Sequence, residues 1–176
     1  MSQIKVNSIV PVGGLSSGFN GGIIQMKQVY KTDAFSMNSD SMTDLTGMTV
    51  TITPSSSSNK ILIVTHLTYG GQANGYFGVN LLRGSTQLGL STAATGNQLN
   101  FSFAIGTGNG DNDYYKCHNA SYAYLDSPAT TSATTYKLQG YSYDSRYFYL
   151  NRGHSVSNAA YIHRSTSSIT AYEIST

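Results

Sequence analysis

Short runs in which apolar residues alternate with polar ones cover most of the chain, and the clearest lies at residues 60–83. The aliphatic stretch Ile61 to Val64 is the densest in the sequence, and a turn rich in glycine and asparagine follows at residues 70–75. Residues 76–81 then alternate large apolar side chains with Tyr, Gly and Asn. A continuous apolar run is typical of a strand buried on both faces, and alternation is typical of a half-buried strand. The pattern predicts one hairpin of a β-sandwich core.

The same kind of alternation predicts strands before and after this hairpin. In a strand at residues 23–30, four side chains share one face: Ile24, Met26, Gln28 and Tyr30. Residues 31–47 form a polar connection with room for a short strand, and residues 48–53 alternate up to a turn that begins at Pro54. Later strands are predicted at residues 85–90, 101–103, 114–125, 134–143, 147–151 and 168–174.

These strands, roughly eight to ten in number and separated by turn residues, predict an all-β fold. No stretch shows a sustained helical period. We expect an antiparallel β-sandwich, jelly-roll-like, that forms a head domain over residues 23–176. The number of strands leaves their order in the sheets open.

Residues 1–22 differ from the rest of the chain. Ile4, Val6 and Ile9 are apolar, but Pro11 and several glycines interrupt the segment. An apolar patch on such a segment cannot bury itself alone. We expect an extended arm, which is either a tail without fixed structure or an assembly arm that docks on a neighbouring chain.

The chain carries few charges. Charged residues make up 10% of it, against about 25% in an average soluble protein. Tyr occurs 14 times and Glu173 is the only glutamate, a composition that favours strands. The net charge of +2 comes without a Lys/Arg cluster, so we expect no nucleic-acid binding. The sequence has no secretory signal and no apolar run of about 18 residues, so we expect synthesis in the cytoplasm and no membrane insertion.

Groups that could carry catalysis or bind metal are scattered. A glycosidase needs two carboxylates beside the bond that it cleaves, but the aspartates lie mostly in loops and Glu173 stands alone in the final predicted strand. The histidines have no metal-ligand spacing, although a symmetric trimer could gather copies of one histidine on its axis. The Asp/Asn-rich loop at residues 109–113 lacks the glutamate that completes a calcium loop. We therefore expect a protein that is not an enzyme and has no cofactor or metal.

The segment YSYDSRYFY at residues 141–149 is the strongest candidate for a binding surface. Four tyrosines flank a turn next to Arg146, and they are Tyr141, Tyr143, Tyr147 and Tyr149. Tyrosine offers a large amphipathic contact area at low entropic cost, and arginine adds bidentate hydrogen bonds. The cluster suits contact with carbohydrate or protein, while alternation predicts that the rings on one strand face pack into the core.

Several blocks of the sequence recur in a known group of proteins. They include SQIKVNSI with the Gly-rich GGLSSGFNGGIIQ, then MTVTITPSSSSNKILIVTHLTYG, LLRGSTQLGL, DSPATTSATTYKL, FYLNRG and STSSITAYEI. In these blocks and their order, the chain resembles the small structural proteins and fibre-tip modules of tailed bacteriophages, especially cyanophages and phages of other aquatic hosts. The resemblance is weakest over residues 91–125.

The resemblance implies a non-enzymatic virion structural protein, usually homotrimeric, with a β-sandwich head and an arm at residues 1–22 that contacts other virion proteins. It implies no particular binding residues. We favour a tail-fibre component that binds a glycan or another receptor on the host surface. A capsid decoration protein that stabilises the phage head is the alternative, and a polysaccharide depolymerase is the third possibility.

Overall fold

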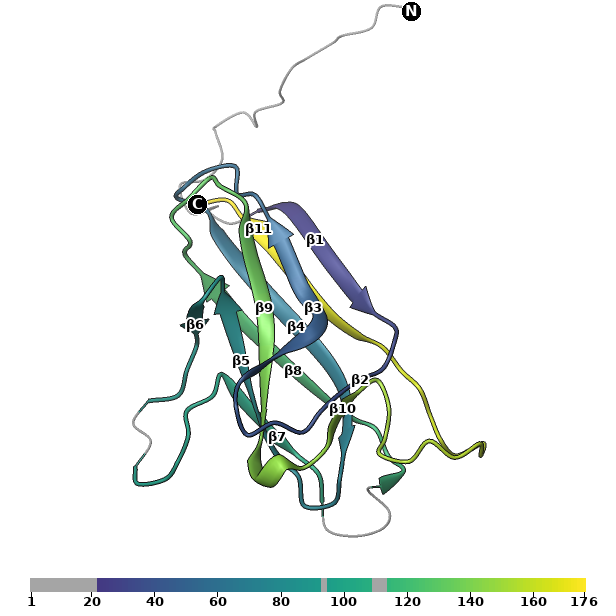
Figure 1. Ribbon diagram of the computed structural model, residues 1–176. Helices are drawn as coiled ribbons and strands as arrows, with labels where there is room; N and C mark the ends of the chain where they lie inside the picture. The colour runs from purple at the N-terminus through teal and green to yellow at the C-terminus, as the bar shows by residue number, and fades with distance from the viewer. Residues whose placement is uncertain (1–21, 93–94, 109–113) are drawn as a thin grey trace, which may run out of the picture.

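The computed structural model describes residues 22–92, 95–108 and 114–176, and two antiparallel β-sheets pack face to face in it (Figure 1). The predicted all-β sandwich is confirmed. Within the described ranges there is no α-helix, and η2 (Tyr143–Ser145) is a single 3₁₀ turn. The predicted arm, with Ile4, Val6 and Ile9, lies outside the described residues.

Sheet A contains six strands and sheet B contains five. Sheet A has the order β1 (Ile23–Lys31), β11 (Ser167–Ile174), β4 (Lys60–Gly71), β10 (Phe148–Leu150) and β2 (Phe35–Met37), and β8 (His118–Asp126) also pairs with β4. Sheet B has the order β3 (Thr43–Ile52), β9 (Thr134–Ser142), β5 (Tyr76–Arg83) and β6 (Thr86–Leu88), and β7 (Phe103–Gly106) also pairs with β5.

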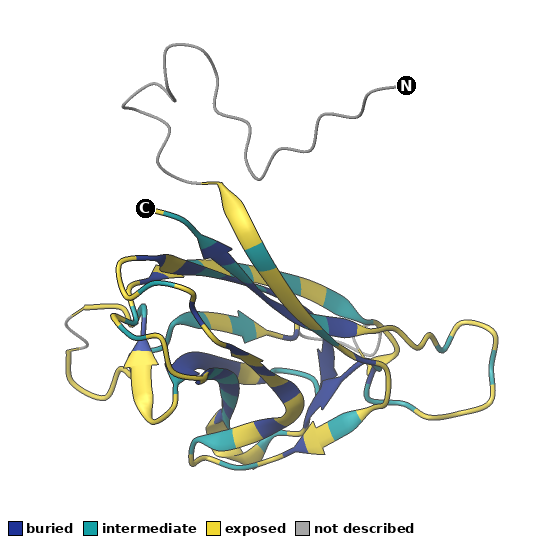
Figure 2. Cartoon of the chain, turned by 90° about the horizontal axis from the view of Figure 1, so that it is seen from above, coloured by how far each residue is buried: buried dark blue, intermediate teal, exposed yellow. Residues whose placement is uncertain are grey.

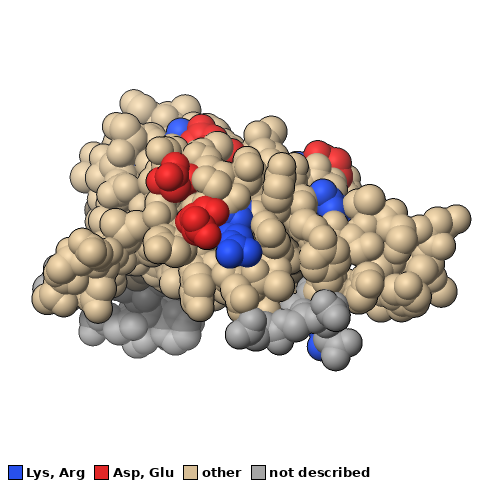
Figure 3. Space-filling view, turned by 60° about the horizontal axis from the view of Figure 1, so that its bottom comes forward, with Lys and Arg blue, Asp and Glu red and all other residues tan. Residues whose placement is uncertain are grey.

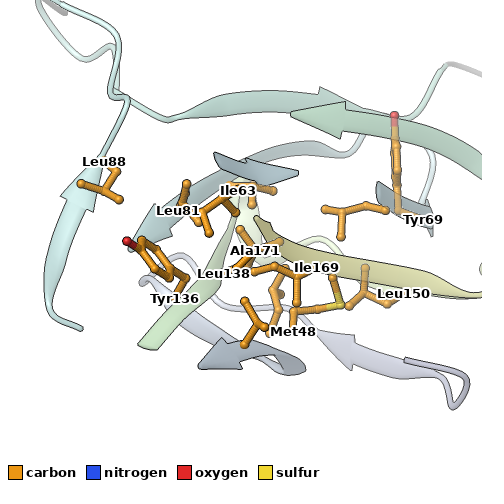
Figure 4. Packing of buried hydrophobic residues seen from close by; sticks show 14 of the residues in the cluster. Met48, Ile63, Tyr69, Leu81, Leu88, Tyr136, Leu138, Leu150, Ile169 and Ala171 are labelled. Carbon is orange, nitrogen blue, oxygen red and sulfur yellow. The ribbon is translucent and has the colours of Figure 1, made fainter. Parts of the chain in front are cut away.

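The hydrophobic core lies between the two sheets. Ile63 and Ile169 of sheet A point toward Met48, Leu81 and Leu138 of sheet B, and all five side chains are fully buried (Figure 4). In each strand the inward side chains occur at every second position, because successive side chains of a strand point to opposite faces. Burying each such side chain contributes about 1.5–3 kcal/mol. The apolar residues of the alternation predicted at residues 48–53, Met48, Val50 and Ile52, therefore form the inward face of β3.

The prediction that residues 60–83 form a hairpin is wrong. β4 and β5 follow each other in sequence, but β4 belongs to sheet A and β5 to sheet B. The connection crosses between the sheets, and there the amide of Gln72 donates to the carbonyl of Tyr147 instead of closing a hairpin. Gly75 permits the crossing, because a Cβ at this position would lie 2.2 Å from Cζ of Phe77.

The prediction that residues 61–64 are buried on both faces is also wrong. Ile61 and Ile63 are fully buried, whereas Leu62 and Val64 point away from the core and are half-buried. A continuous apolar run can indicate a second covered face, but the partner strands of β4 cover only its edges.

The other strands differ from prediction mainly at their ends. β3 begins at Thr43 rather than at residue 48, because its pairing with β9 continues past a register shift between Asp44 and Thr49. Gly47 lies within this irregularity and has a φ of 85°, in the left-handed region that favours glycine. β8 begins at His118 rather than at residue 114.

Two buried carboxylates join the layers. Asp126 at the end of β8 accepts hydrogen bonds from Arg83 of β5, at 2.9 and 2.8 Å, and from the hydroxyl of Tyr136 of β9, at 2.7 Å. Burial, followed by the hydrogen bond to Asp126, raises the pKa of Tyr136. Asp126 thus links β8 of sheet A to β5 and β9 of sheet B.

Glu173 of β11 fixes the turn between β3 and β4. Its Oε1 accepts the backbone amide of Ser55 at 2.6 Å, the hydroxyl of Ser55 at 2.7 Å and the side-chain amide of Asn59 at 2.6 Å. Burial by itself raises the pKa of Glu173, but the hydrogen bonds outweigh it and the net pKa lies below its ordinary value.

Candidate aromatic binding site

A groove lined by aromatic rings lies on the outer side of sheet B. Tyr143 begins the η2 turn directly after β9, and Tyr76 begins β5, the strand that pairs with β9. Their ring centroids lie 6.4 Å apart at an angle of 76°. The exposed fractions are 66% for Tyr76 and 59% for Tyr143, so both rings present most of their surface to solvent.

The η2 turn needs an unusual backbone. Asp144 and Ser145 have φ values of 55° and 50°, in the left-handed region. Aspartate and serine are short polar residues, and aspartate is among those that enter this region most readily. The hydroxyl of Ser142 bonds to the carbonyl of Arg146 across the turn. This closure fixes the direction in which Tyr143 leaves the sheet.

Phe101 forms another wall of the groove, and its ring packs directly against the backbone of Gly78. A Cβ at Gly78 would be only 2.2 Å from the Phe101 ring, so no other residue at position 78 leaves room for the ring in this place. Phe101 also packs against Tyr141 at a centroid distance of 5.5 Å. The result is a cavity of about 360 Å³ whose lining includes Tyr76, Asn97, Leu99, Phe101, Tyr141 and Tyr143.

A second, more polar hollow lies beside Phe101 and Tyr141. It has a volume of about 250 Å³, and its polar lining residues are Asp40, Asn80, Gln87 and Asn100. The side-chain oxygen of Asn80 is engaged, since it accepts the amide of Ser102 at 3.0 Å. Leu99, Phe101 and Tyr141 line both hollows. An apolar platform of rings therefore continues into a pocket with a carboxylate and amides.

This arrangement matches the chemistry of sugars. One face of a pyranose ring carries C–H groups that stack on aromatic rings, while its hydroxyls pair with carboxylates and amides. Ligand sites in proteins are typically concave, about 300–1,000 Å³ in volume, and mostly apolar with a few placed polar groups. The two adjoining hollows have both features.

The tyrosines of the predicted binding segment fall into two groups. Tyr141 and Tyr143 line the groove, whereas the rings of Tyr147 and Tyr149 stack on each other at 5.8 Å and belong to another cluster. Tyr149 is 6% exposed, and the Arg152 guanidinium lies 3.7 Å from its ring centroid. Burial raises the pKa of Tyr149, against the effect of Arg152.

Arg146 follows the η2 turn, and its backbone amide donates to the carbonyl of Tyr143 at 3.3 Å. Its guanidinium faces Asp144 at 3.4 Å in an ion pair on the η2 turn. His154 lies in the second cluster, 5.3 Å from Tyr149 and 4.0 Å from Tyr114. Burial lowers the pKa of His154, and Arg152 lowers it further. This cluster packs the loops around β10.

Sequence reasoning missed Tyr76, Phe101 and Leu99 as groove residues. Tyr76 was expected only as an outward position of a strand, and Phe101 as part of a short strand. The pairing of β5 with β9 brings Tyr76 next to Tyr143, which is 67 positions away in the chain. The glycine at position 78 was the available signal, because a glycine inside a strand often marks the close approach of another group.

Among the described residues, no group of three His, Cys, Asp or Glu side chains is placed to hold a metal ion. The same residues contain no helix with the length and apolar character of a membrane span.

No family model matches this sequence, and no curated protein does. Among solved structures, the chain is similar to a protein chain in the structure of infectious bursal disease virus, Gx strain, with 13% sequence identity and a TM-score of 0.42. The match covers 97% of this chain and 42% of that chain. A similarity at this level supports no conclusion about fold or function. The fold assignment rests on the strand pairing itself.

Proposed function

We propose that this protein is a non-enzymatic, homotrimeric virion structural protein of a tailed bacteriophage that binds a glycan on the host surface through the aromatic groove. The observation that carries the binding proposal is the pair of exposed rings, Tyr76 and Tyr143, beside the hollow that contains Asp40. The proposed virion role rests on the resemblance of the sequence blocks to phage structural proteins.

The composition of the surface agrees with this role. Figure 3 shows a face on which acidic and basic side chains occupy only a few places and uncharged residues cover the rest. A surface of hydroxyls, amides and tyrosines offers hydrogen bonds and stacking without strong attraction to ions. Receptor contact through neutral sugars suits such a surface better than contact with nucleic acid, which needs a basic patch.

The test of binding uses the full chain and a panel of neutral oligosaccharides together with lipopolysaccharide purified from the host. Tyr76→Ala and Tyr143→Ala should each weaken binding about three- to tenfold, because each removes a ring contact. Tyr161→Ala removes an equally exposed ring far from the groove, beside Tyr115, and should leave binding unchanged. If the probes bind equally well to all four proteins, the groove is not the glycan site.

A second candidate function is capsid decoration. The exposed apolar residues Ile24, Met26 and Tyr30 on β1, directly after the segment at residues 1–21, favour a protein that lies on other subunits. Gold-labelled antibody on intact virions separates the two locations. Label at the tail supports attachment, whereas label over the head, with particles that burst more easily when the protein is missing, supports decoration.

The depolymerase alternative requires two free carboxylates near the bound glycan. Asp126 and Glu173 are buried and occupied by hydrogen bonds. Among the described residues, Asp40 is the carboxylate that lines the more polar hollow, and the aromatic groove has none in its lining. Purified protein that releases oligosaccharides from host polysaccharide, with loss of release in Asp40→Asn, would revive this alternative.

A further inference from the structure

The outer side of sheet A carries a continuous apolar row. Strand register places Met26 of β1 opposite Tyr172 of β11, Tyr172 opposite Leu62 of β4, and Leu62 opposite Leu125 of β8. Directly paired residues of neighbouring strands point to the same side of a sheet. The row therefore crosses four strands, and it is open to solvent at both ends, where Met26 is 55% and Leu125 is 49% exposed.

Further apolar residues widen this row. Val64 and Ala123 are paired in the next outward position of β4 and β8, and Ile24 and Tyr30 are exposed on β1. Figure 2 shows that β1, the first strand of the described chain, is exposed over most of its length. The alternation of β1 that was predicted from the sequence is thus an outward stripe rather than a core face. We call the outward side chains of β1, β11, β4 and β8 the apolar face.

The apolar face is almost free of charge. The outward positions of its four strands carry no carboxylate, and Lys60, at one end of β4, is the residue with a formal charge at neutral pH. The polar residues among them are small or uncharged. Gln28, for example, donates to the hydroxyl of Thr170 at 2.9 Å and so turns its polar end toward the sheet.

The extent of the apolar face is that of an interface. Four strands about 4.8 Å apart and about seven residues long, at about 3.4 Å per residue, span roughly 450 Å² before the corrugation of side chains is counted. This area contains polar side chains as well as the apolar row, since Gln28 and Thr170 share the next row with Val64 and Ala123, and Ser168, His66 and Ser121 lie in the row beyond it. A standard interface buries about 800 Å² on each partner, so this face supplies more than half of one.

We infer that the apolar face binds the same face of other copies of this chain. A copy matches the face in both properties that matter: the same right-handed twist allows aligned packing of one sheet on another, and neither surface brings a carboxylate that would lose its water. In a dimer two faces stack, and in a trimer three faces turn toward a common axis. The inference rests on the proposed self-association and names the surface that carries it.

The location of the apolar face leaves the glycan groove free. The groove lies on the outer side of sheet B, and the apolar face lies on the outer side of sheet A, with the core between them. Copies joined through sheet A therefore present their grooves outward. Several weak sites that point to one cell surface act together and bind far more tightly than one.

The test measures the mass of the full chain by sedimentation over a range of micromolar concentrations. The unchanged protein should be a trimer, and the double variant Met26→Lys, Leu125→Lys should dissociate at least tenfold more readily. Both replaced side chains are about half exposed, so the fold should survive, as circular dichroism can verify. The matched control is Thr49→Lys with Thr51→Lys, which places two lysines on exposed positions of sheet B and should leave the mass unchanged.

Several outcomes would overturn the inference. A monomer at all concentrations refutes self-association, and an oligomer that persists in the Met26, Leu125 double variant refutes this surface. Loss of association in the full chain with Ile4→Asp and Val6→Asp would make the N-terminal segment the occupant instead of a second face. Unchanged glycan binding by a monomeric variant would show that the groove is independent, so the two proposals can fail separately.

Footprinting provides a readout on the surface itself. Oxidation of Met26 by hydroxyl radicals should fall severalfold when the protein concentration is raised from the dissociated to the associated range. Tyr161, which is equally exposed but lies in a loop, should be modified to the same extent throughout. A Met26 side chain that stays equally reactive in the oligomer would overturn the assignment.

Discussion

The outer sides of the two sheets meet the surroundings in different ways. On sheet B, the outward side chains of β3 and β9 are polar up to Tyr141 at the groove. They include threonines, Lys137 and Gln139, and Asp44 binds Lys137 and Gln139 at 2.8 and 2.7 Å. On sheet A, the corresponding positions form the apolar face around Leu62 and Tyr172. Both sheets bury their inner sides in the same core. This difference is what the inferred self-association through sheet A requires, since only the outer side of sheet A offers a row of apolar side chains across four strands.

The aromatic residues on the outer sides of the two sheets are also arranged differently. On sheet B they gather at one end, where Tyr76, Tyr143 and Phe101 enclose a cavity. On sheet A, Tyr30 is exposed at the edge strand, and the half-buried Tyr172 is paired with Met26 on one side and Leu62 on the other. A concave group of rings suits a small ligand, whereas a broad and nearly flat apolar surface suits another sheet.

The largest expected effect comes from the two sides of a single strand. Ile63→Ala removes a fully buried side chain of β4 from the core and should lower the free energy of unfolding by about 3–4 kcal/mol. Leu62→Ala acts on the outward side of the same strand and should cost about 1 kcal/mol in the dissociated protein, because Leu62 is half-buried there. Urea denaturation at low protein concentration measures both. Equal losses would contradict the assignment of inner and outer sides.

The next effect concerns the ionic link between the sheets. Asp126→Ala leaves the Tyr136 hydroxyl and the Arg83 guanidinium without their shared acceptor and should cost about 3 kcal/mol. Asp44→Ala is the matched control, since it breaks an ion pair with Lys137 on the outer side of sheet B and should cost less than about 1 kcal/mol. Urea midpoints compare the two variants. A control as damaging as Asp126→Ala would mean that burial does not distinguish the two carboxylates.

A smaller and pH-dependent effect is expected at Glu173, at the turn that leads from sheet B to sheet A. Hydrogen bonds from Asn59 and Ser55 outweigh burial and lower the pKa of Glu173 in the folded protein below its ordinary value of 4.5. The unfolded chain then binds the proton more readily than the folded protein. The stability that Glu173 contributes is therefore complete above about pH 5, and it is lost as the pH falls through the lowered pKa.

Glu173→Gln should remove this part of the acid sensitivity and cost about 1–2 kcal/mol at neutral pH. Unfolding free energies measured between pH 3 and pH 7 compare the variant with the unchanged protein. Asp144→Asn, a change at an exposed carboxylate of the η2 turn, serves as the control and should retain the acid sensitivity. If Glu173→Gln loses stability with falling pH as steeply as the unchanged protein, the hydrogen bonds of Glu173 do not act as described.

Much of the fold was predictable because alternation is a local signal. Met48, Val50 and Ile52 alternate with threonines in the sequence, and the structure buries these three and leaves Thr49 and Thr51 exposed. For β1 the same signal was clear but its direction was not. Ile24, Met26 and Tyr30 share one face, yet this face points outward because the edge strand β1 lies over β3 with its other side.

The candidate site was predictable only in part. The tyrosine-rich segment was correctly singled out as dense in aromatic residues, but its four rings diverge because η2 separates Tyr143 from Tyr147 and turns the chain between the two groups. The partners Tyr76 and Phe101 reach the groove through strand pairing between distant parts of the chain. Such pairing has no local signature, except for the glycine at position 78 that makes room for the Phe101 ring.

Local alternation was enough to predict that this chain forms strands, where most of them lie and which side chains lie together on one side of each, since these properties depend on neighbours two positions apart. Three features became visible only in the folded chain: β4 and β5 belong to different sheets, the outward row through Leu62 is continuous, and Tyr76 meets Tyr143. These outcomes depend on how strands distant in sequence pair and cross. The packing free energy that favours this pairing comes from the whole core, so no single segment of the sequence predicts it.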